Sequence, residues 1–159
     1  MNNWNATELR RKEEPVKIQE PGIYTRLLLS KVERDDTKFK YSFTTTIGEE
    51  KYTDIAVFYT PNEGYTKTVK EQQTAIAEKM ISIADAVGSP TEVSKLPPQA
   101  SFMAFMETLN RYIESKANKA FVNIKIVMDS KGQYCKVADF GFIEKFTEGK
   151  ESQLYFSTW

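Results

Sequence analysis

The segment from residue 120 to residue 146 constrains the fold most, because it has the pattern of two β-strands joined by a short loop. Apolar residues alternate with other residues in both halves, which predicts that each strand buries one face. The alternating positions are Val122, Ile124, Ile126, Met128, Cys135, Val137 and Ile143. Between the halves lies Asp129-Ser130-Lys131-Gly132, a four-residue loop whose glycine can adopt a positive φ. We therefore expect a β-hairpin within an antiparallel sheet.

The loop length decides which residues face each other across this hairpin. On the face away from the core it places Lys125 opposite Lys136 and Phe121 opposite Phe140. Opposed lysines repel each other and do not stabilise a hairpin. A bound single-stranded nucleic acid would explain them, because lysines contact its phosphates and aromatic rings stack on its bases. The alternative is a solvent-exposed face whose lysine ammonium groups extend into water.

The composition fits one domain without disulfide bonds. The chain has 159 residues, of which 40% are hydrophobic, and this length suits a single hydrophobic core. Twenty-two basic residues balance 22 acidic ones, so nucleic-acid binding would need a local basic groove rather than an overall positive charge. Cys135 is the single cysteine, which indicates a reducing compartment. No apolar run could span a membrane and no signal peptide is visible, so we expect a soluble, cytoplasmic protein.

The chain contains no histidine, which excludes serine–histidine and cysteine–histidine nucleophile pairs and the commonest transition-metal ligand. Glu49-Glu50-Lys51, with Asp35 or Asp36 upstream, matches the acidic-x-Lys element of a common metal nuclease. However, this triplet lies in a predicted turn, whereas such a site needs carboxylates that converge in the middle of a sheet. No glycine-rich phosphate loop occurs. We therefore predict no catalysis, no metal and no cofactor.

The rest of the chain predicts three further strands and two helices. Residues 1–19 are polar and predict a flexible arm, and residues 20–159 form one domain. Strands at 23–32, 38–47 and 51–60 are joined by short turns, which predicts an antiparallel meander. The apolar period then changes to 3.6, which predicts helices at 68–87 and 101–115 within a helical insertion at 66–117. Residues 153–159 offer a short last strand.

This order predicts a mostly β, α+β chain, namely an OB-fold-like antiparallel five-stranded barrel with a two-helix insertion between strands 3 and 4. Over residues 20–146 the chain resembles phage-encoded single-stranded-DNA-binding proteins with an OB fold. The resemblance lies in Glu20-Pro21-Gly22-Ile23-Tyr24, in Ala84-Asp85-Ala86-Val87-Gly88 and in Phe140-Gly141-Phe142. It implies sequence-independent binding of single-stranded DNA in replication or recombination, in the host cytoplasm if the protein is phage-encoded. The chain does not end in the flexible acidic tail of many such proteins, so recruitment through a tail is not expected.

The predicted binding surface combines the outward face of the first three strands with the later hairpin. Phosphate contacts are predicted for Arg26, Lys40, Lys125 and Lys136, and base stacking for Tyr52, Phe58, Tyr134 and Phe140. The preference for DNA over RNA follows from the resemblance, and replication or recombination proteins or a second copy of the chain are compatible partners. The alternative is a virion or assembly protein whose apolar helices dock a protein partner. Salt-dependent DNA binding would separate the two.

Overall fold

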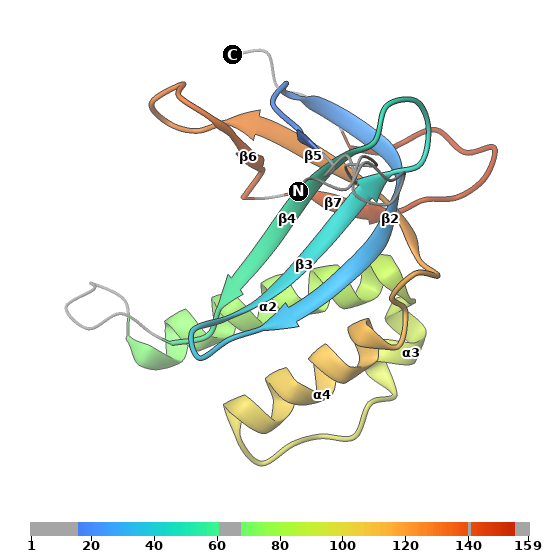
Figure 1. Cartoon of the computed structure of the whole chain (residues 1–159). Coiled ribbons are helices and arrows are strands. Elements are labelled where there is room, and N and C mark those ends of the chain that lie inside the picture. The colour runs from blue at the N-terminus through green and yellow to red at the C-terminus, as the bar shows by residue number, and fades with distance from the viewer. Residues whose placement is uncertain (1–15, 61–67, 140, 155–159) are drawn as a thin grey trace, which may run out of the picture.

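The computed structural model describes residues 16–60, 68–139 and 141–154, which form a mixed α+β fold dominated by a curled β-sheet (Figure 1). The strands are β1 (Val16–Lys17), β2 (Gly22–Arg34), β3 (Lys38–Thr45), β4 (Lys51–Phe58), β5 (Phe121–Met128), β6 (Cys135–Val137) and β7 (Ile143–Lys145). The helices are α2 (Val69–Val87), α3 (Pro90–Ser94) and α4 (Phe102–Glu114). The described helices lie between β4 and β5 in the chain, as predicted, and α3 is an addition to the two expected helices.

Strand β2 organises the sheet because it pairs with neighbours on both sides. The strand order is β1-β4-β3-β2-β5-β6, and β7 also pairs with β5. Residues 27–34 of β2 pair with β3, and residues 22–28 pair with β5, both antiparallel. Register shifts between Tyr24 and Leu27 and between Leu29 and Lys31 mark β-bulges, which increase twist and bend a strand. The predicted meander of β2, β3 and β4 is confirmed.

The sheet curls into a half-barrel, which agrees with the predicted barrel-like curvature, but it stays open and has seven described strands, so closure and the predicted count of five strands are wrong. Among the described strands, no ladder joins the two ends of the sheet, β1 and β6. The second strand of the hairpin is interrupted: Ala138 N–H donates to Lys125 O at 3.0 Å, and Lys125 N–H donates to Phe142 O at 2.9 Å. The chain therefore leaves the ladder after Ala138 and rejoins it at Phe142. Strand β6 has three residues and pairs with β5 alone among the described strands.

The hairpin turn lies one residue later than predicted. Asp129 N–H donates to Tyr134 O at 2.8 Å, and Asp129 Oδ1 accepts hydrogen bonds from the N–H groups of Gln133 and Tyr134. These bonds close a four-residue loop at residues 130–133, in which Gly132 has the expected positive φ of 65°. The Asp129 side chain therefore selects a turn that the loop length alone did not distinguish.

This later turn moves the register by two residues. Ile126 pairs with Val137 and Val127 pairs with Lys136, so the apolar face is kept. Lys136 consequently faces Val127, and the prediction that Lys125 lies opposite Lys136 is wrong. The Phe121 carbonyl accepts a backbone hydrogen bond from Phe146 N–H, and Phe140, the predicted partner of Phe121, lies outside the described residues.

The buried face of the sheet and the helices enclose the core. Figure 1 shows α2 crossing beneath β2, β3 and β4, with α4 below it. Six apolar residues of β3 and α4 are fully buried, namely Phe39, Tyr41, Phe43, Met106, Leu109 and Ile113, whereas Phe102, Phe105 and Tyr112 on the same side of α4 are half-buried. The Tyr41 hydroxyl donates to Asn110 Oδ1 at 2.7 Å, which satisfies a buried polar group. Helices α2 and α4 therefore contribute apolar side chains to the core.

Three ends of predicted elements differ from the structure. Residues 16–19 were assigned to the arm, but Val16 and Lys17 pair in parallel with β4, and Ile18 is buried. Residues 1–15 lie outside the described residues. The strand predicted at 38–47 ends at Thr45, and Ile47, beyond its end, is 68% exposed. Residues 153 and 154 are not in a strand, and the remainder of the predicted last strand lies outside the described residues.

Helix α2 begins and ends where its sequence signals predict. Thr68 Oγ1 accepts a hydrogen bond from Glu71 N–H at 3.1 Å, which is the expected N-cap. At the other end, Gly88 is buried against the Tyr112 ring of α4, and a Cβ atom at Gly88 would collide with the Tyr112 hydroxyl. The glycine thus permits α2 and α4 to approach closely. No helix in the described parts of the chain is long and apolar enough to cross a membrane.

Candidate nucleic-acid interface

The outward faces of β2, β3 and β4 form one continuous surface, as the alternation predicted. One row across the sheet consists of Tyr52, Thr44, Leu28 and Phe121 on four neighbouring strands. A hollow of about 440 Å³ lies on this surface, which we call the outer hollow. Its lining residues are Ser30, Lys31, Glu33, Lys40, Ser42, Thr44, Glu50, Tyr52 and Asp54. The structure therefore brings together Lys40 and Tyr52, two of the residues predicted to bind nucleic acid.

The outer hollow does not have the charge of a phosphate-binding surface. It contains two lysines and three carboxylates. Lys40 Nζ lies 3.8 Å from Glu33 Oε2 and 3.8 Å from Asp54 Oδ2. Lys31 also pairs with Glu33, and their hydrogen bond lowers the pKa of the Glu33 carboxyl. A polyanion would have to compete with these carboxylates, so this surface does not favour the phosphate contact that we predicted for Lys40.

The other predicted residues are spread over the molecule. Phe58 is 58% exposed at the far end of β4, where Lys38 Nζ lies 5.4 Å from its ring centroid. Tyr134 is 60% exposed and lines a hollow of about 340 Å³ beside residues 17–19. Lys136 Nζ pairs with Asp139 at 3.4 Å. Of the remaining three, Lys125 lies where the chain leaves the β5 ladder, Arg26 lies in a β2 bulge, and Phe140 is outside the described residues.

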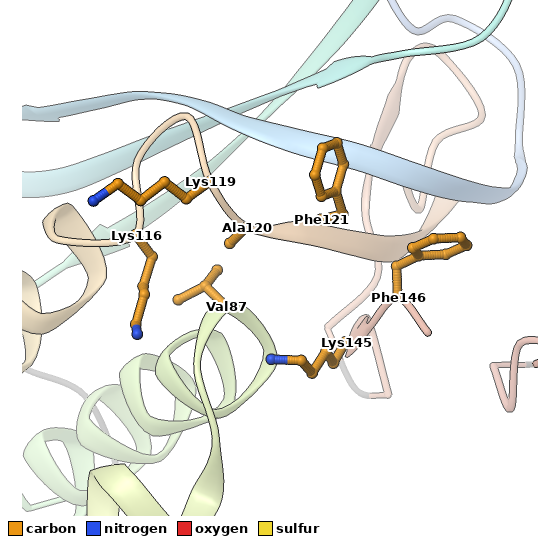
Figure 2. Close-up of a pocket in the computed structure, with 7 residues that line it drawn as sticks. All are labelled: Val87, Lys116, Lys119, Ala120, Phe121, Lys145 and Phe146. Atoms are coloured by element: carbon orange, nitrogen blue, oxygen red, sulfur yellow. The ribbon is translucent and has the colours of Figure 1, made fainter. Parts of the chain in front are cut away.

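A second concave site combines lysine and phenylalanine side chains (Figure 2). It encloses about 320 Å³ beside the start of β5 and the end of α2. Its lining residues are Val87, Lys116, Lys119, Ala120, Phe121, Lys145 and Phe146, and we call it the lysine pocket. Figure 2 shows the two phenyl rings at one end and the side chains of Lys116 and Lys119 at the other. Three lysines are thus among the lining residues, and no carboxylate is among the described ones.

The three lysines differ in how far they are already engaged. Lys145 Nζ donates to Gly88 O at 2.7 Å, which satisfies a carbonyl at the end of α2. Lys116 Nζ lies 3.8 Å from Glu92 Oε1 and 5.3 Å from the centroid of the Tyr112 ring. The Lys119 side chain is exposed and makes no hydrogen bond or ion pair with the part of the chain that the structure describes. A bound anion would therefore find its least engaged cation at Lys119.

Arg26 adds a fourth cation next to the lysine pocket. The guanidinium carbon lies 5.7 Å from the centroid of the Phe121 ring, and Phe121 lines the pocket. Arg26 is the predicted phosphate-binding residue that lies beside the pocket. The pocket lysines were not among the residues predicted to bind phosphate, although Lys116-x-x-Lys119-x-Phe121 is a basic and aromatic cluster in the sequence. Strand alternation does not single out these lysines, because they lie in the connection between α4 and β5.

The nuclease-like triplet does not form a metal site. Glu49 and Glu50 lie in the turn between β3 and β4, whereas Asp35 lies beyond the opposite end of β3. Eight strand residues separate these turns, which corresponds to about 25 Å, too far for carboxylates to share one cation. Among the described residues, no group of three acidic or cysteine side chains is placed to hold a metal ion.

Comparison with protein families, curated proteins and solved structures finds no match.

Proposed function

We propose that this protein binds single-stranded nucleic acid without sequence preference and without catalysis, with the lysine pocket as its principal anchor. The observation that carries the proposal is the pocket itself, in which three lysines and two phenylalanines converge with no carboxylate among the described lining residues. Ammonium groups neutralise phosphates, and phenyl rings stack on bases of any identity. The volume of about 320 Å³ is at the lower end for ligand pockets, so it suits one nucleotide of a longer strand.

The strand connections support an OB-like fold as part of this proposal. An OB fold consists of a partly open Greek-key barrel of five strands. Here a three-stranded meander is followed by a helical insertion, and β5 then returns to pair with the first long strand, β2. The openness of this sheet and the split of its last strand into β6 and β7 are departures from that pattern. DNA rather than RNA, and a role in replication or recombination, follow from the resemblance to phage proteins.

The proposal predicts a measurable salt dependence. Each phosphate neutralised on a single strand contributes about 0.7 to the slope of log affinity against log salt concentration. Contacts from Arg26 and the three pocket lysines would give a slope of about −2.8, from four times 0.7. A slope change of 0.7 corresponds to about a fivefold change in affinity over the tenfold range of salt concentration from 1 M to 0.1 M. Loss of one such contact is therefore expected to weaken binding about fivefold in 0.1 M salt.

The test compares the two lysine-containing surfaces. Fluorescence anisotropy with labelled oligo-dT at several salt concentrations measures affinity and slope for Lys116→Ala/Lys119→Ala and for the matched control Lys31→Ala/Lys40→Ala. We expect the pocket variant to bind about 25-fold more weakly in 0.1 M salt, with a slope smaller by about 1.4. The control should change less than about twofold. Wild-type protein that does not bind oligo-dT, or a control that loses more affinity than the pocket variant, would overturn the proposal.

A further inference from the structure

Arg26 has a backbone conformation that is unusual for arginine. Its φ is 57°, in the left-handed region that glycine adopts without cost, and it lies within the bulge between Tyr24 and Leu27. A side chain with a Cβ atom makes this conformation unfavourable, and it persists only where the surrounding structure enforces it. Such strained positions concentrate at functional sites, so the contacts that hold Arg26 are informative.

Two side chains from other parts of the chain hold the Arg26 backbone. Asn123 is 3% exposed, and its Oδ1 accepts a hydrogen bond from Arg26 N–H at 3.1 Å. The amide nitrogen of Asn123 donates to Glu144 Oε1 at 2.8 Å, which determines which way the amide points. Thr46, in the turn between β3 and β4, donates its hydroxyl to Arg26 O at 2.7 Å. Both backbone polar groups of Arg26 are therefore fixed by side chains.

The bulge places the Arg26 side chain where the proposed function needs it. The guanidinium stands beside Phe121, which is shared with the lysine pocket. Among the basic side chains, arginine is the one whose planar fork can donate two parallel hydrogen bonds to a phosphate. Arg26 would thus complement the pocket lysines, which act as point charges. An uninterrupted strand would lack the local turn that the bulge introduces at this residue.

We propose that Asn123 is a positioning residue for nucleic-acid binding. It holds the Arg26 backbone in its left-handed conformation, so that the guanidinium can bind the phosphate of the nucleotide in the lysine pocket. The inference rests on the proposed function and assigns Asn123 no contact with the ligand. Thr46 has the same role from the other side of the bulge. Glu144 acts one step further away, by fixing the Asn123 amide.

A double-mutant cycle tests this role, with labelled oligo-dT as the probe. The variants are Arg26→Ala, Asn123→Ala and the two combined. Each single change should weaken binding about fivefold in 0.1 M salt and reduce the salt slope by about 0.7. The combined variant should bind no more weakly than Arg26→Ala, because Asn123 acts through Arg26. The inference would be overturned if the combined variant bound about 25-fold more weakly than the wild type, so that the two fivefold losses multiply. It would also be overturned if Asn123→Ala left the salt slope unchanged. A merely structural role for Asn123 predicts both results.

Two further variants keep the test decisive. If Asn123→Ala fails to fold, Thr46→Val at an exposed position replaces it in the cycle, with the same expected dependence on Arg26. Arg26→Gly should melt at a temperature equal to or above that of Arg26→Ala, because glycine relieves the strain, while both lose the same affinity. If Lys116→Ala/Lys119→Ala weakens binding and Arg26→Ala does not, this inference fails and the proposed function stands. If wild-type protein does not bind, both fail.

Discussion

The outer hollow and the lysine pocket both combine lysines with aromatic residues, but they differ in what lies next to each lysine. In the outer hollow, Lys40 stands 3.8 Å from two carboxylates contributed by neighbouring strands. In the lysine pocket, Lys116 Nζ lies 3.8 Å from Glu92 Oε1, and Glu92 is not one of the lining residues. Lys119 has no acidic partner within the described residues. The comparison teaches that a count of lysines does not locate a polyanion site in a protein of zero net charge. The number of carboxylates among the described lining residues separates the two surfaces: three line the outer hollow and none lines the lysine pocket.

Reversal of one charge in the lysine pocket should cause the largest change in oligo-dT affinity. Lys119→Glu removes one cation and adds an anion inside the pocket, so we expect oligo-dT affinity in 0.1 M salt to fall by more than about 25-fold, which is two fivefold steps. The matched control is Lys70→Glu, at the other end of α2, about 25 Å from Val87 along the helix. Anisotropy titration should show a loss below about fivefold for the control. Equal losses would mean that overall charge, and not the pocket, governs binding.

Removal of an aromatic ring should separate stacking from charge. Phe146→Ala should weaken oligo-dT binding by about 1–3 kcal/mol and leave the salt slope unchanged, because a stacked base contributes no counterion release. Phe58→Ala is the control, since Phe58 is exposed at the far end of the outer surface. Its affinity should equal that of the wild type. A loss with Phe58→Ala alone would return the base-stacking site to the outer surface, where the sequence analysis placed it.

Neutralised carboxylates should make the outer hollow resemble the pocket. Glu33→Gln/Asp54→Asn frees Lys31 and Lys40 from their ion pairs, so the slope should steepen by about 0.7 to 1.4 if both lysines then reach phosphates. Affinity in 0.1 M salt should rise about 5- to 25-fold, in line with that slope change, and stability should change little because exposed ion pairs contribute about 0–1 kcal/mol. Titration with oligo-dT and thermal melts measure both. Unchanged affinity would show that position, and not only charge balance, disfavours the outer hollow.

The smallest expected effect concerns the acid dependence of stability near the pocket. Burial raises the pKa of Glu144, but hydrogen bonds from Ser152 and Asn123 outweigh it and hold the pKa below its usual value. Because the folded pKa is below the unfolded one, this group stabilises the protein above about pH 5 and less as the pH falls through the folded pKa. Glu144→Gln should therefore show a shallower fall in Tm than the wild type between about pH 5 and 3.

Glu50→Gln in the outer hollow is the control for this pH series. Its carboxylate makes no hydrogen bond or ion pair within the described residues, so we expect the wild-type dependence. If Tm falls with pH in Glu144→Gln as steeply as in the wild type, Glu144 does not contribute to the acid dependence of stability.

Local pattern determined the strands, their buried faces and the helix ends. Alternation in β3 predicted that Phe39, Tyr41 and Phe43 face the core, because side chains of a strand point to opposite faces in turn. The N-cap at Thr68 and the positive φ of Gly132 depend on residues within a few positions, so they too could be predicted.

Tertiary structure alone decided which charges became neighbours. Lys116 and Lys145 are far apart in the sequence, and they share a pocket because β7 pairs with β5 and α4 ends beside β5. Lys40 was predicted to contact phosphate because it lies on the outward face of its strand. Its proximity to Asp54, however, depends on the register of β3 and β4. Register and strand order arise from long-range pairing, and a local signal such as the Asp129 side chain in one turn can move a hairpin by two residues. A binding site built from cross-strand neighbours is therefore decided by pairing, whereas the face of each residue is decided by the sequence alone.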